Sequence, residues 1–188
     1  MATVSVFNFM TLNGFYKGIK NDISWHQHGD EEAVFSEENL KRGGILLFGR
    51  VTYELMAGYW STEAAKQGFR NLANEMNNAE KIVFSRTLTA TNWENTRLVR
   101  HEAVDEIHRL KASGGKNMTI LGSGSLASQC VDAGLIDEYQ LMIDPVAIGE
   151  GIPVFCDVKN KLELRLVDCR TFKSGAVLLT YHPAQLHY

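Results

Sequence analysis

The sequence lacks the features that mark several classes of protein. Its three cysteines, Cys130, Cys156 and Cys169, are far apart and form no CxxC pair, so we expect neither a disulfide framework nor a cysteine-based zinc site. No apolar run approaches the roughly 18 residues of a transmembrane helix, and the N-terminus has no basic segment typical of a signal peptide. We therefore expect a cytoplasmic protein without a membrane partner.

The sequence also lacks a strong excess of charge of one sign. It has 19 Lys and Arg against 22 Asp and Glu, and no basic cluster is dense enough to indicate nucleic-acid binding. There is no internal repeat and no low-complexity tract. At this length, residues 1–188 are expected to form a single globular domain.

Two catalytic motifs are missing as well. The GxGxxG fingerprint of Rossmann dehydrogenases does not occur, and no GxSxG motif supports a serine hydrolase. His26 and His28 have the spacing of a metal-binding pair, but no convincing third ligand is close in sequence, and such pairs in loops are usually incidental. A metal-dependent hydrolase that uses these histidines is therefore a minor alternative, and we expect no metal.

What the sequence does contain is an alternation of short apolar runs with segments of helical periodicity. Strands are expected at 3–12, 45–48, 81–85, 96–99, 118–121 and 137–144. Helices are expected at 30–42, from 49 to 56, in a longer segment capped by Ser61, at 102–113 and after 125. Residues 15–29 are expected to be irregular. This alternation predicts an α/β domain.

The C-terminal part has a different pattern. Residues 162–166 alternate between apolar and polar with a period of two, and Ser174-Gly175 precede the apolar run AVLLTY. Such a pattern is typical of an antiparallel hairpin with one solvated face. The sheet is therefore predicted to be mixed.

Two strand-to-helix junctions are candidates for phosphate binding. TILGSGSLAS at 119–128 runs from an apolar strand through a glycine-serine turn into a helix, and ILLFGRVT at 45–52 does the same with Arg50 and Thr52 after its glycine. Helix N-termini direct N–H groups and a positive dipole end toward an anion. Most such turns bind nothing. The presence of two at the ends of parallel strands nevertheless indicates a pyrophosphate site.

A third junction follows the strand KIVF. Here Ser85 and Arg86 supply a hydroxyl and a guanidinium at the end of a strand. These groups could hold a 2′-phosphate, which would favour NADP over NAD. By itself this junction would be interpreted as a solvated loop.

The segment before the first helix has further candidates. Asp30, Glu31 and Glu32 are typical first-turn acids, although one of them could face a cavity and donate a proton. Trp25 and Phe15 could cover a planar ligand or anchor the loop to the core. The residues alone leave these alternatives open.

The order of motifs resembles a known superfamily. A first strand ending in TLNGF is followed by LFGRVTYE, KIVFSRTL, ILGSGSLA and GLIDEYQLMIDPVAIGEGIPVF. This order, from Val4 to Tyr181, resembles the dihydrofolate-reductase-like superfamily, in the branch of the riboflavin-biosynthesis reductase C-terminal domain and its stand-alone bacterial relatives. The resemblance implies a three-layer α/β fold with a mixed, mostly parallel sheet of about eight strands, flanking helices and a C-terminal antiparallel hairpin.

The resemblance also implies which residues form the site. NADPH would be bound by Phe9, Gly49, Arg50, Thr52, Ser85, Arg86, Leu121, Gly122, Ser123, Gly124, Ser125 and Leu126. The substrate would lie against Phe15, Trp25 and Phe48. Asp30 is the best counterpart of the acid that dihydrofolate reductases place after the tryptophan loop. Asn13 stands where the branch has an acidic residue, and both are expected to have catalytic roles.

One backbone feature follows from the same resemblance. Dihydrofolate reductases join two adjacent glycines of the late loop by a cis peptide bond, and the corresponding pair here is Gly122-Ser123. We expect this bond to be cis.

The implied function is an NADPH-dependent reductase. It would transfer a hydride to a small heterocyclic or carbonyl/imine substrate, pterin- or pyrimidine-like. The alternative is a nucleotide-binding regulatory module of the same fold without turnover. Relatives of this kind often form homodimers, and the apolar residues at 148–155 could contribute to such an interface.

Overall fold

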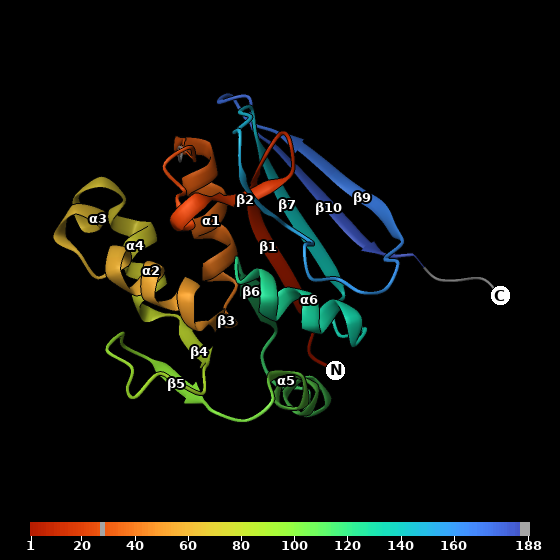
Figure 1. Ribbon diagram of the computed structural model, residues 1–188. Helices are drawn as coiled ribbons and strands as arrows, with labels where there is room; N and C mark the ends of the chain where they lie inside the picture. The colour runs from red at the N-terminus through yellow and green to blue at the C-terminus, as the bar shows by residue number, and fades with distance from the viewer. Residues whose placement is uncertain (27–28, 185–188) are drawn as a thin grey trace.

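The computed structural model describes residues 1–26 and 29–184, and its central feature is a twisted eight-stranded sheet (Figure 1). The strands are β1 (Val4–Thr11), β2 (Phe15–Gly18), β3 (Ile45–Gly49), β4 (Glu80–Phe84), β5 (Thr96–Val99), β6 (Met118–Leu121), β7 (Glu138–Asp144), β8 (Gly151–Pro153), β9 (Leu164–Thr171) and β10 (Val177–Pro183). The helices are α1 (Asp30–Lys41), α2 (Arg50–Trp60), α3 (Glu63–Gly68), α4 (Arg70–Asn78), α5 (Ala103–Ala112) and α6 (Gly124–Asp132), with a 3-10 turn η1 (Ile19–Asn21).

The strand order is β5-β4-β3-β6-β1-β7-β10-β9. The pairs from β5 to β7 are all parallel, whereas β10 is antiparallel to both β7 and β9. The predicted mixed sheet with a C-terminal hairpin is therefore confirmed. From β1 the chain crosses to β3 on one side, and from the neighbouring strand β6 it crosses to β7 on the other. The carboxyl ends of β1 and β6 are therefore a topological switch point, where ligands bind in open α/β sheets.

The helices cover the sheet on both faces, which confirms the three-layer architecture. On one face, Val4 and Val6 of β1 pack in a buried cluster with Leu126 and Cys130 of α6. On the other face, Leu46 and Phe48 of β3 pack with α2, α3 and α4. A third cluster joins Phe7 of β1 to Phe35 of α1, whose ring centroids are 6.2 Å apart.

The helical segment after Ser61 differs from the expectation. It forms two helices that meet at Phe69, whose φ of −138° and ψ of 58° are not helical. Thr62, rather than Ser61, is the N-cap, and its Oγ1 accepts a hydrogen bond of 3.2 Å from the Ala65 N–H. Glycine is a poor helix former, and Gly68 ends α3 before the break. In addition, α2 continues to Trp60 instead of ending at Met56.

The segment 15–29 is more ordered than expected. Its first residues form β2, which pairs with β8 in a separate antiparallel ribbon. Pairing at this distance in sequence leaves no local pattern. A Cβ on Gly151 would lie 2.6 Å from the Lys17 carbonyl oxygen, so glycine is needed where the two strands approach.

The hairpin also differs in one respect. The sequence pattern predicts one solvated face, but β9 is exposed or partly exposed along its whole length, with Leu166 at 49% exposure. The reason is its position at the edge of the sheet. Within the segment expected at a dimer interface, Val154 is buried in the chain's own core and Gly151–Pro153 pair with β2. The homodimer stays a prediction.

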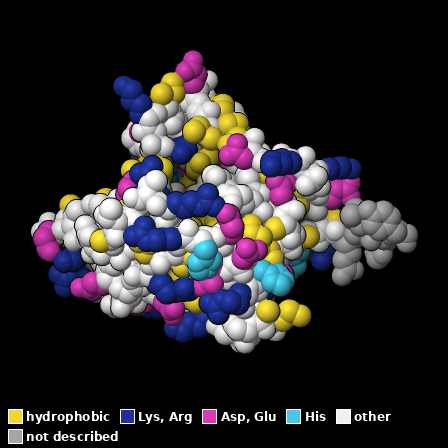
Figure 2. All heavy atoms as spheres, turned by 60° about the horizontal axis from the view of Figure 1, so that its bottom comes forward, with side chains coloured by type: hydrophobic (Ala, Val, Ile, Leu, Met, Phe, Trp, Pro, Cys, Tyr) yellow, Lys and Arg dark blue, Asp and Glu magenta, His cyan; other side chains and the backbone are white. Residues whose placement is uncertain are grey.

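Among the described residues, no helix is both long and apolar enough to cross a bilayer. The face that carries α5 and β5 shows basic and acidic side chains intermixed (Figure 2). Among the acidic residues of α5 is Glu106, whose side chain is 4% exposed. Arg109 donates to it through Nε and Nη2 at 2.9 and 2.8 Å, and Arg97 donates at 2.8 Å. These hydrogen bonds, first those from Arg109, lower the pKa of Glu106 to about 2.

A prediction follows for stability. Because the folded-state pKa of Glu106 lies below its usual value of 4.5, its contribution is fully present above pH 4.5 and is lost as the pH falls toward 2. Glu106→Gln should lower the free energy of unfolding at pH 7 by about 2 kcal/mol, and urea denaturation between pH 7 and 3 should show the difference from wild type shrinking below pH 4.5. Glu63→Gln, at an exposed pair with Lys66, should cost less than about 0.5 kcal/mol. A difference for Glu106→Gln that is independent of pH would contradict this account.

Candidate functional site

Two connected hollows open at the carboxyl ends of the parallel strands. The larger is a cleft of about 620 Å³ between the sheet and helices α1 and α2, and the smaller is a groove of about 460 Å³ at the starts of α2, α5 and α6. Both are lined by Tyr16, Lys17, Val51 and Thr52. A ligand in the groove would therefore be adjacent to one in the cleft.

Where the groove begins, hydrogen bonds join the two glycine turns, at Gly49 and at Gly122-Ser123. We call this contact the lock. The Gly49 N–H donates to the Ser123 hydroxyl oxygen at 3.0 Å, and the Ser123 N–H donates to Thr52 Oγ1 at 3.1 Å. The Ser123 hydroxyl in turn donates to the Leu121 carbonyl at 3.0 Å. Residue 123 is the N-cap position of α6, and Gly49 is that of α2. The first turns of both helices, whose N–H groups have no intrahelical acceptor, are thus held side by side.

The turn at Gly122 and Ser123 has a different backbone from the one expected. The described chain contains no cis peptide bond, so the expectation of a cis Gly122-Ser123 bond is wrong. The chain reverses instead through two consecutive left-handed residues, with φ of +57° at Gly122 and +52° at Ser123. A left-handed serine is uncommon. Its three hydrogen bonds to the neighbouring turn and strand hold it in this conformation.

Tyr16 covers the start of α6. A Cβ on Gly124 would lie 2.7 Å from the Tyr16 hydroxyl oxygen, so the absence of a side chain at Gly124 lets the ring pack there. Burial, the largest effect, raises the pKa of Tyr16. The phenol oxygen lies beside the start of α6, close to where an anion at a helix N-terminus would be.

The far end of the groove is formed by Ser85, Arg86, His101 and Glu102. Ser85 closes its own turn, because its hydroxyl oxygen accepts from the Leu88 N–H at 2.9 Å. Arg86 forms an exposed ion pair with Glu102. The sequence predicts the first two residues at this place, but the carboxylate beside the guanidinium is not foreseen.

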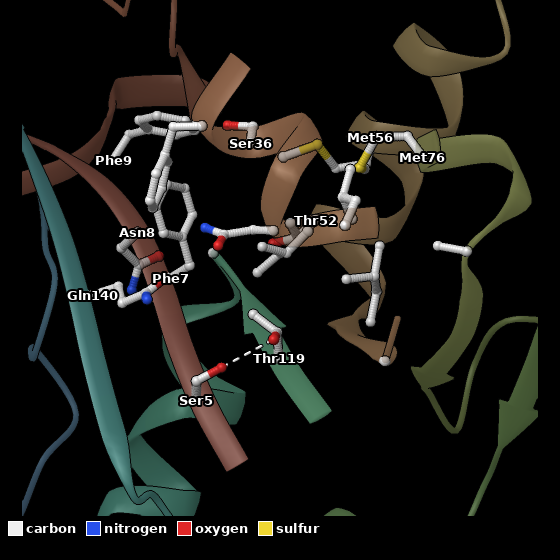
Figure 3. A pocket seen from close by; sticks show the side chains of 18 of the residues that line it. Ser5, Phe7, Asn8, Phe9, Ser36, Thr52, Met56, Met76, Thr119 and Gln140 are labelled. Atoms are coloured by element: carbon white, nitrogen blue, oxygen red, sulfur yellow. Dashed lines mark hydrogen bonds between the residues drawn. The ribbon is translucent and has the colours of Figure 1, made fainter. Parts of the chain in front are cut away.

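The cleft has aromatic walls. Figure 3 shows Phe7 and Phe9 of β1 on one side, with Met56 and Met76 across from them. Deeper in, Ser5 and Thr119 share a hydrogen bond of 2.9 Å (Figure 3). The cleft is thus lined by apolar side chains together with a smaller number of polar ones, which is typical of a small-molecule site.

Two polar atoms of the cleft are buried without a hydrogen-bond partner among the described residues. They are Oδ1 of Asn8, a residue that is 2% exposed, and Nε1 of Trp25. Asn8 Oδ1 lies beside the glycine turn, 3.9 Å from where a Cβ on Gly122 would be. Because buried polar atoms in native proteins are nearly always paired, an unpaired acceptor and an unpaired donor in a cleft indicate groups that meet a ligand.

His26 and Asp144 form a pair that sequence reasoning missed. His26 Nδ1 is 3.1 Å from both carboxylate oxygens of Asp144, a residue that is 6% exposed at the end of β7. The imidazole also stacks on Phe9, with ring centroids 3.8 Å apart. An imidazole oriented by a buried carboxylate is a common proton donor. The two residues are 118 positions apart, and no local signal connects them.

The predicted cofactor residues all line these hollows. Phe9, Leu121 and Gly122 line the cleft, Thr52 lines both, and the groove is lined by Gly49, Arg50, Ser85, Arg86, Ser123, Gly124, Ser125 and Leu126. Trp25 lines the cleft, as the substrate prediction implies. Sequence reasoning missed Lys17, Glu102 and Gln129.

Four predicted residues lie elsewhere, outside the described lining of both hollows. Asp30 is exposed at the first position of α1. Asn13 pins the β1–β2 turn to Ile148, donating to its carbonyl at 2.8 Å. Phe15 packs on Gly151, and Phe48 is 0% exposed in the core beside Trp93. For Phe15 and Phe48, strand alternation decides the orientation, because successive side chains of a strand point to opposite faces.

Of the two histidines considered as a metal-binding pair, His28 lies outside the described residues. Among the described residues, no group of three or more His, Cys, Asp or Glu could hold a metal ion. His26 is instead hydrogen-bonded to Asp144.

A prediction tests the lock at the glycine turn. A Cβ on Gly122 would lie 3.2 Å from Thr52 Cγ2, whereas one on Gly134, with a similar φ of +64°, would meet nothing within 4 Å. Both substitutions to alanine should cost about 1 kcal/mol or more for the left-handed backbone. Gly122→Ala should lose about 1 kcal/mol beyond that by pushing on Thr52, as measured by urea denaturation. Equal losses would show that the Thr52 contact is not a constraint.

The comparisons with known proteins agree with this geometry. The family model described as RibD C-terminal domain matches residues 2–178. The protein YyaP of Bacillus subtilis (strain 168), described as uncharacterized, is 32% identical over 173 residues, which cover 92% of this chain and 90% of YyaP.

Two solved structures show the same fold. One, from Shewanella sp. PV-4, is described as a riboflavin biosynthesis protein. It is 21% identical with a TM-score of 0.75, and the match covers 98% of this chain and 100% of that one. The other is the Thermotoga maritima diaminohydroxyphosphoribosylaminopyrimidine deaminase/5-amino-6-(5-phosphoribosylamino)uracil reductase, which is 18% identical with a TM-score of 0.70, over 97% of this chain and 57% of that one. At these identities the structures establish the fold, and the family match establishes that the chain belongs to the RibD C-terminal domain family.

Proposed function

We propose that the protein is an NADPH-dependent reductase that binds its cofactor in the groove and a small heterocyclic or carbonyl/imine substrate in the cleft. The observation that carries this proposal is the continuity of the two hollows at Tyr16, Lys17, Val51 and Thr52, next to two helix N-termini. The name of the Thermotoga maritima relative includes a uracil reductase, which supports a pyrimidine-like substrate.

The groove has the features that a dinucleotide requires. The first turns of α2 and α6 supply N–H groups and two positive dipole ends for a pyrophosphate. Arg50, which opens α2 and pairs with Glu54 at 2.9 Å in solvent, can turn to a phosphate at little cost, because exposed ion pairs are weak. Asn8 Oδ1 offers a buried acceptor where the groove meets the cleft.

The bound nicotinamide would supply the hydride, and the chain's own residues position the substrate and move the proton. The Asp144 carboxylate accepts a hydrogen bond from His26 Nδ1–H, which makes Nε2 the nitrogen that exchanges a proton with a bound molecule. His26 would thus donate a proton to the nitrogen or oxygen of the reduced double bond.

A regulatory module without turnover is the second candidate. The observation that favours it is that Asp30 and Asn13, the expected catalytic residues, lie outside the described lining of both hollows. Binding of NADPH without its oxidation by any member of a panel of pterins, aminopyrimidines and quinones would support this candidate over the reductase.

The first prediction concerns nucleotide binding. NADPH at about 100 times its dissociation constant should stabilise the protein by about 2.7 kcal/mol and raise the melting temperature by roughly 5–10 °C. Adenosine at the same concentration should have a much smaller effect, since it has no pyrophosphate. No response to NADPH or NADH at millimolar concentration, in melting temperature or nicotinamide fluorescence, would contradict the proposed function.

The second prediction concerns the proton donor. His26→Gln should lower kcat at least about 100-fold for any panel compound that the wild type reduces, and should leave the NADPH dissociation constant within about twofold, because His26 lines the cleft and not the groove. His182→Gln is a matched control, since His182 also lines the cleft and also faces a carboxylate, that of Glu138 at 3.4 Å. An unchanged kcat for His26→Gln would exclude the assigned role.

A further inference from the structure

The far end of the groove has an unexpected arrangement of charge. Arg86 follows β4, and Glu102 precedes α5, yet their side chains meet in an ion pair at the groove lining. Both side chains are largely in solvent, at 72% and 60% exposure. The positive charge that would attract a phosphate is thus balanced by a carboxylate at the same place.

The position of this pair relates it to one part of a dinucleotide. This step rests on the proposed function. With the pyrophosphate at the starts of α2 and α6 and the nicotinamide toward the cleft at Tyr16, the adenosine lies at the opposite end of the groove. The lining there consists of Ser85, Arg86, His101, Glu102 and Ala103.

The two forms of the cofactor would meet this end differently. A 2′-phosphate needs the Arg86 guanidinium, but this group is already ion-paired with Glu102. The phosphate would therefore lie beside the negative charge of the Glu102 carboxylate. A ribose 2′-hydroxyl can instead donate a hydrogen bond to a carboxylate, as acidic residues do in NAD sites. The neighbouring His101 does not by itself balance the charge of Glu102, because His101 Nε2 lies 3.4 Å from the carboxylate of Glu106.

We propose that Glu102 is a specificity-determining residue of the cofactor groove. Its carboxylate holds Arg86 and disfavours a 2′-phosphate, so that the groove accepts NADH alongside NADPH. Removal of this charge should convert the groove into one selective for NADPH.

The test is a charge series at position 102 in the full chain. The dissociation constants of NADPH and NADH are measured by nicotinamide fluorescence for wild type, Glu102→Gln and Glu102→Lys. The ratio of the NADH to the NADPH constant should rise about three- to tenfold in Glu102→Gln and further in Glu102→Lys. Glu102 is the N-cap position of α5 but makes no side-chain cap hydrogen bond, so the variants should retain the wild-type melting temperature. Arg86→Ala should lower the ratio, because the 2′-phosphate loses its cation.

A matched control separates a local effect from a change in overall charge. Glu80 lies at the opposite end of β4 and pairs with Lys116 at 3.0 Å, again in solvent. Glu80→Gln should leave the ratio unchanged. A ratio that stays within twofold across the Glu102 series while both nucleotides bind, or that rises equally in Glu80→Gln, would overturn the assignment of Glu102. If neither nucleotide binds to the wild type, the proposed function itself fails and the inference fails with it.

Discussion

The hydrogen bonds of Ser123 are the constraint on which the site depends. They join the end of β6 to the end of β3 and set the starts of α2 and α6 next to each other. The left-handed conformation of Ser123 and the absence of a side chain at Gly122 serve the same contact, and the absence of one at Gly124 lets Tyr16 pack at the start of α6. The proposed site for an extended anion depends on two helix N-termini, each a weak site alone, being held in one fixed arrangement.

Segments far apart in the sequence complete the site around this lock. The β2–β8 ribbon carries Tyr16 to the first turn of α6, where it lines both the groove and the cleft. The residues before α1 place His26 against Phe9 and Asp144, at the ends of β1 and β7. The proposed cofactor groove and the proposed proton donor are thus built by different parts of the chain, and they meet at the central strands of the sheet.

Local patterns in the sequence predict most strands, most helices and the strand-to-helix junctions that line the groove, because glycine turns and apolar runs express local backbone requirements. Interactions over a distance leave no such trace. Lys81 belongs to the predicted strand KIVF, yet it is buried, donates to the carbonyls of Met76 and Asn77 at 2.9 Å, and has a pKa lowered to about 8 by burial. The orientation of Phe48 into the core and the contact of Arg86 with Glu102 likewise follow from strand register and helix position, which the sequence alone does not specify.

The central claim is that a dinucleotide pyrophosphate binds between the starts of α2 and α6. The most direct measurement is an ¹H–¹⁵N NMR titration of the ¹⁵N-labelled protein with NADPH. The account predicts that the largest shifts occur at the amides of residues 50–52 and 124–126, with smaller shifts at 85–86 and 101–103. Shifts that cluster elsewhere on the protein, with the amides of both helix starts unchanged at saturating NADPH, would contradict it.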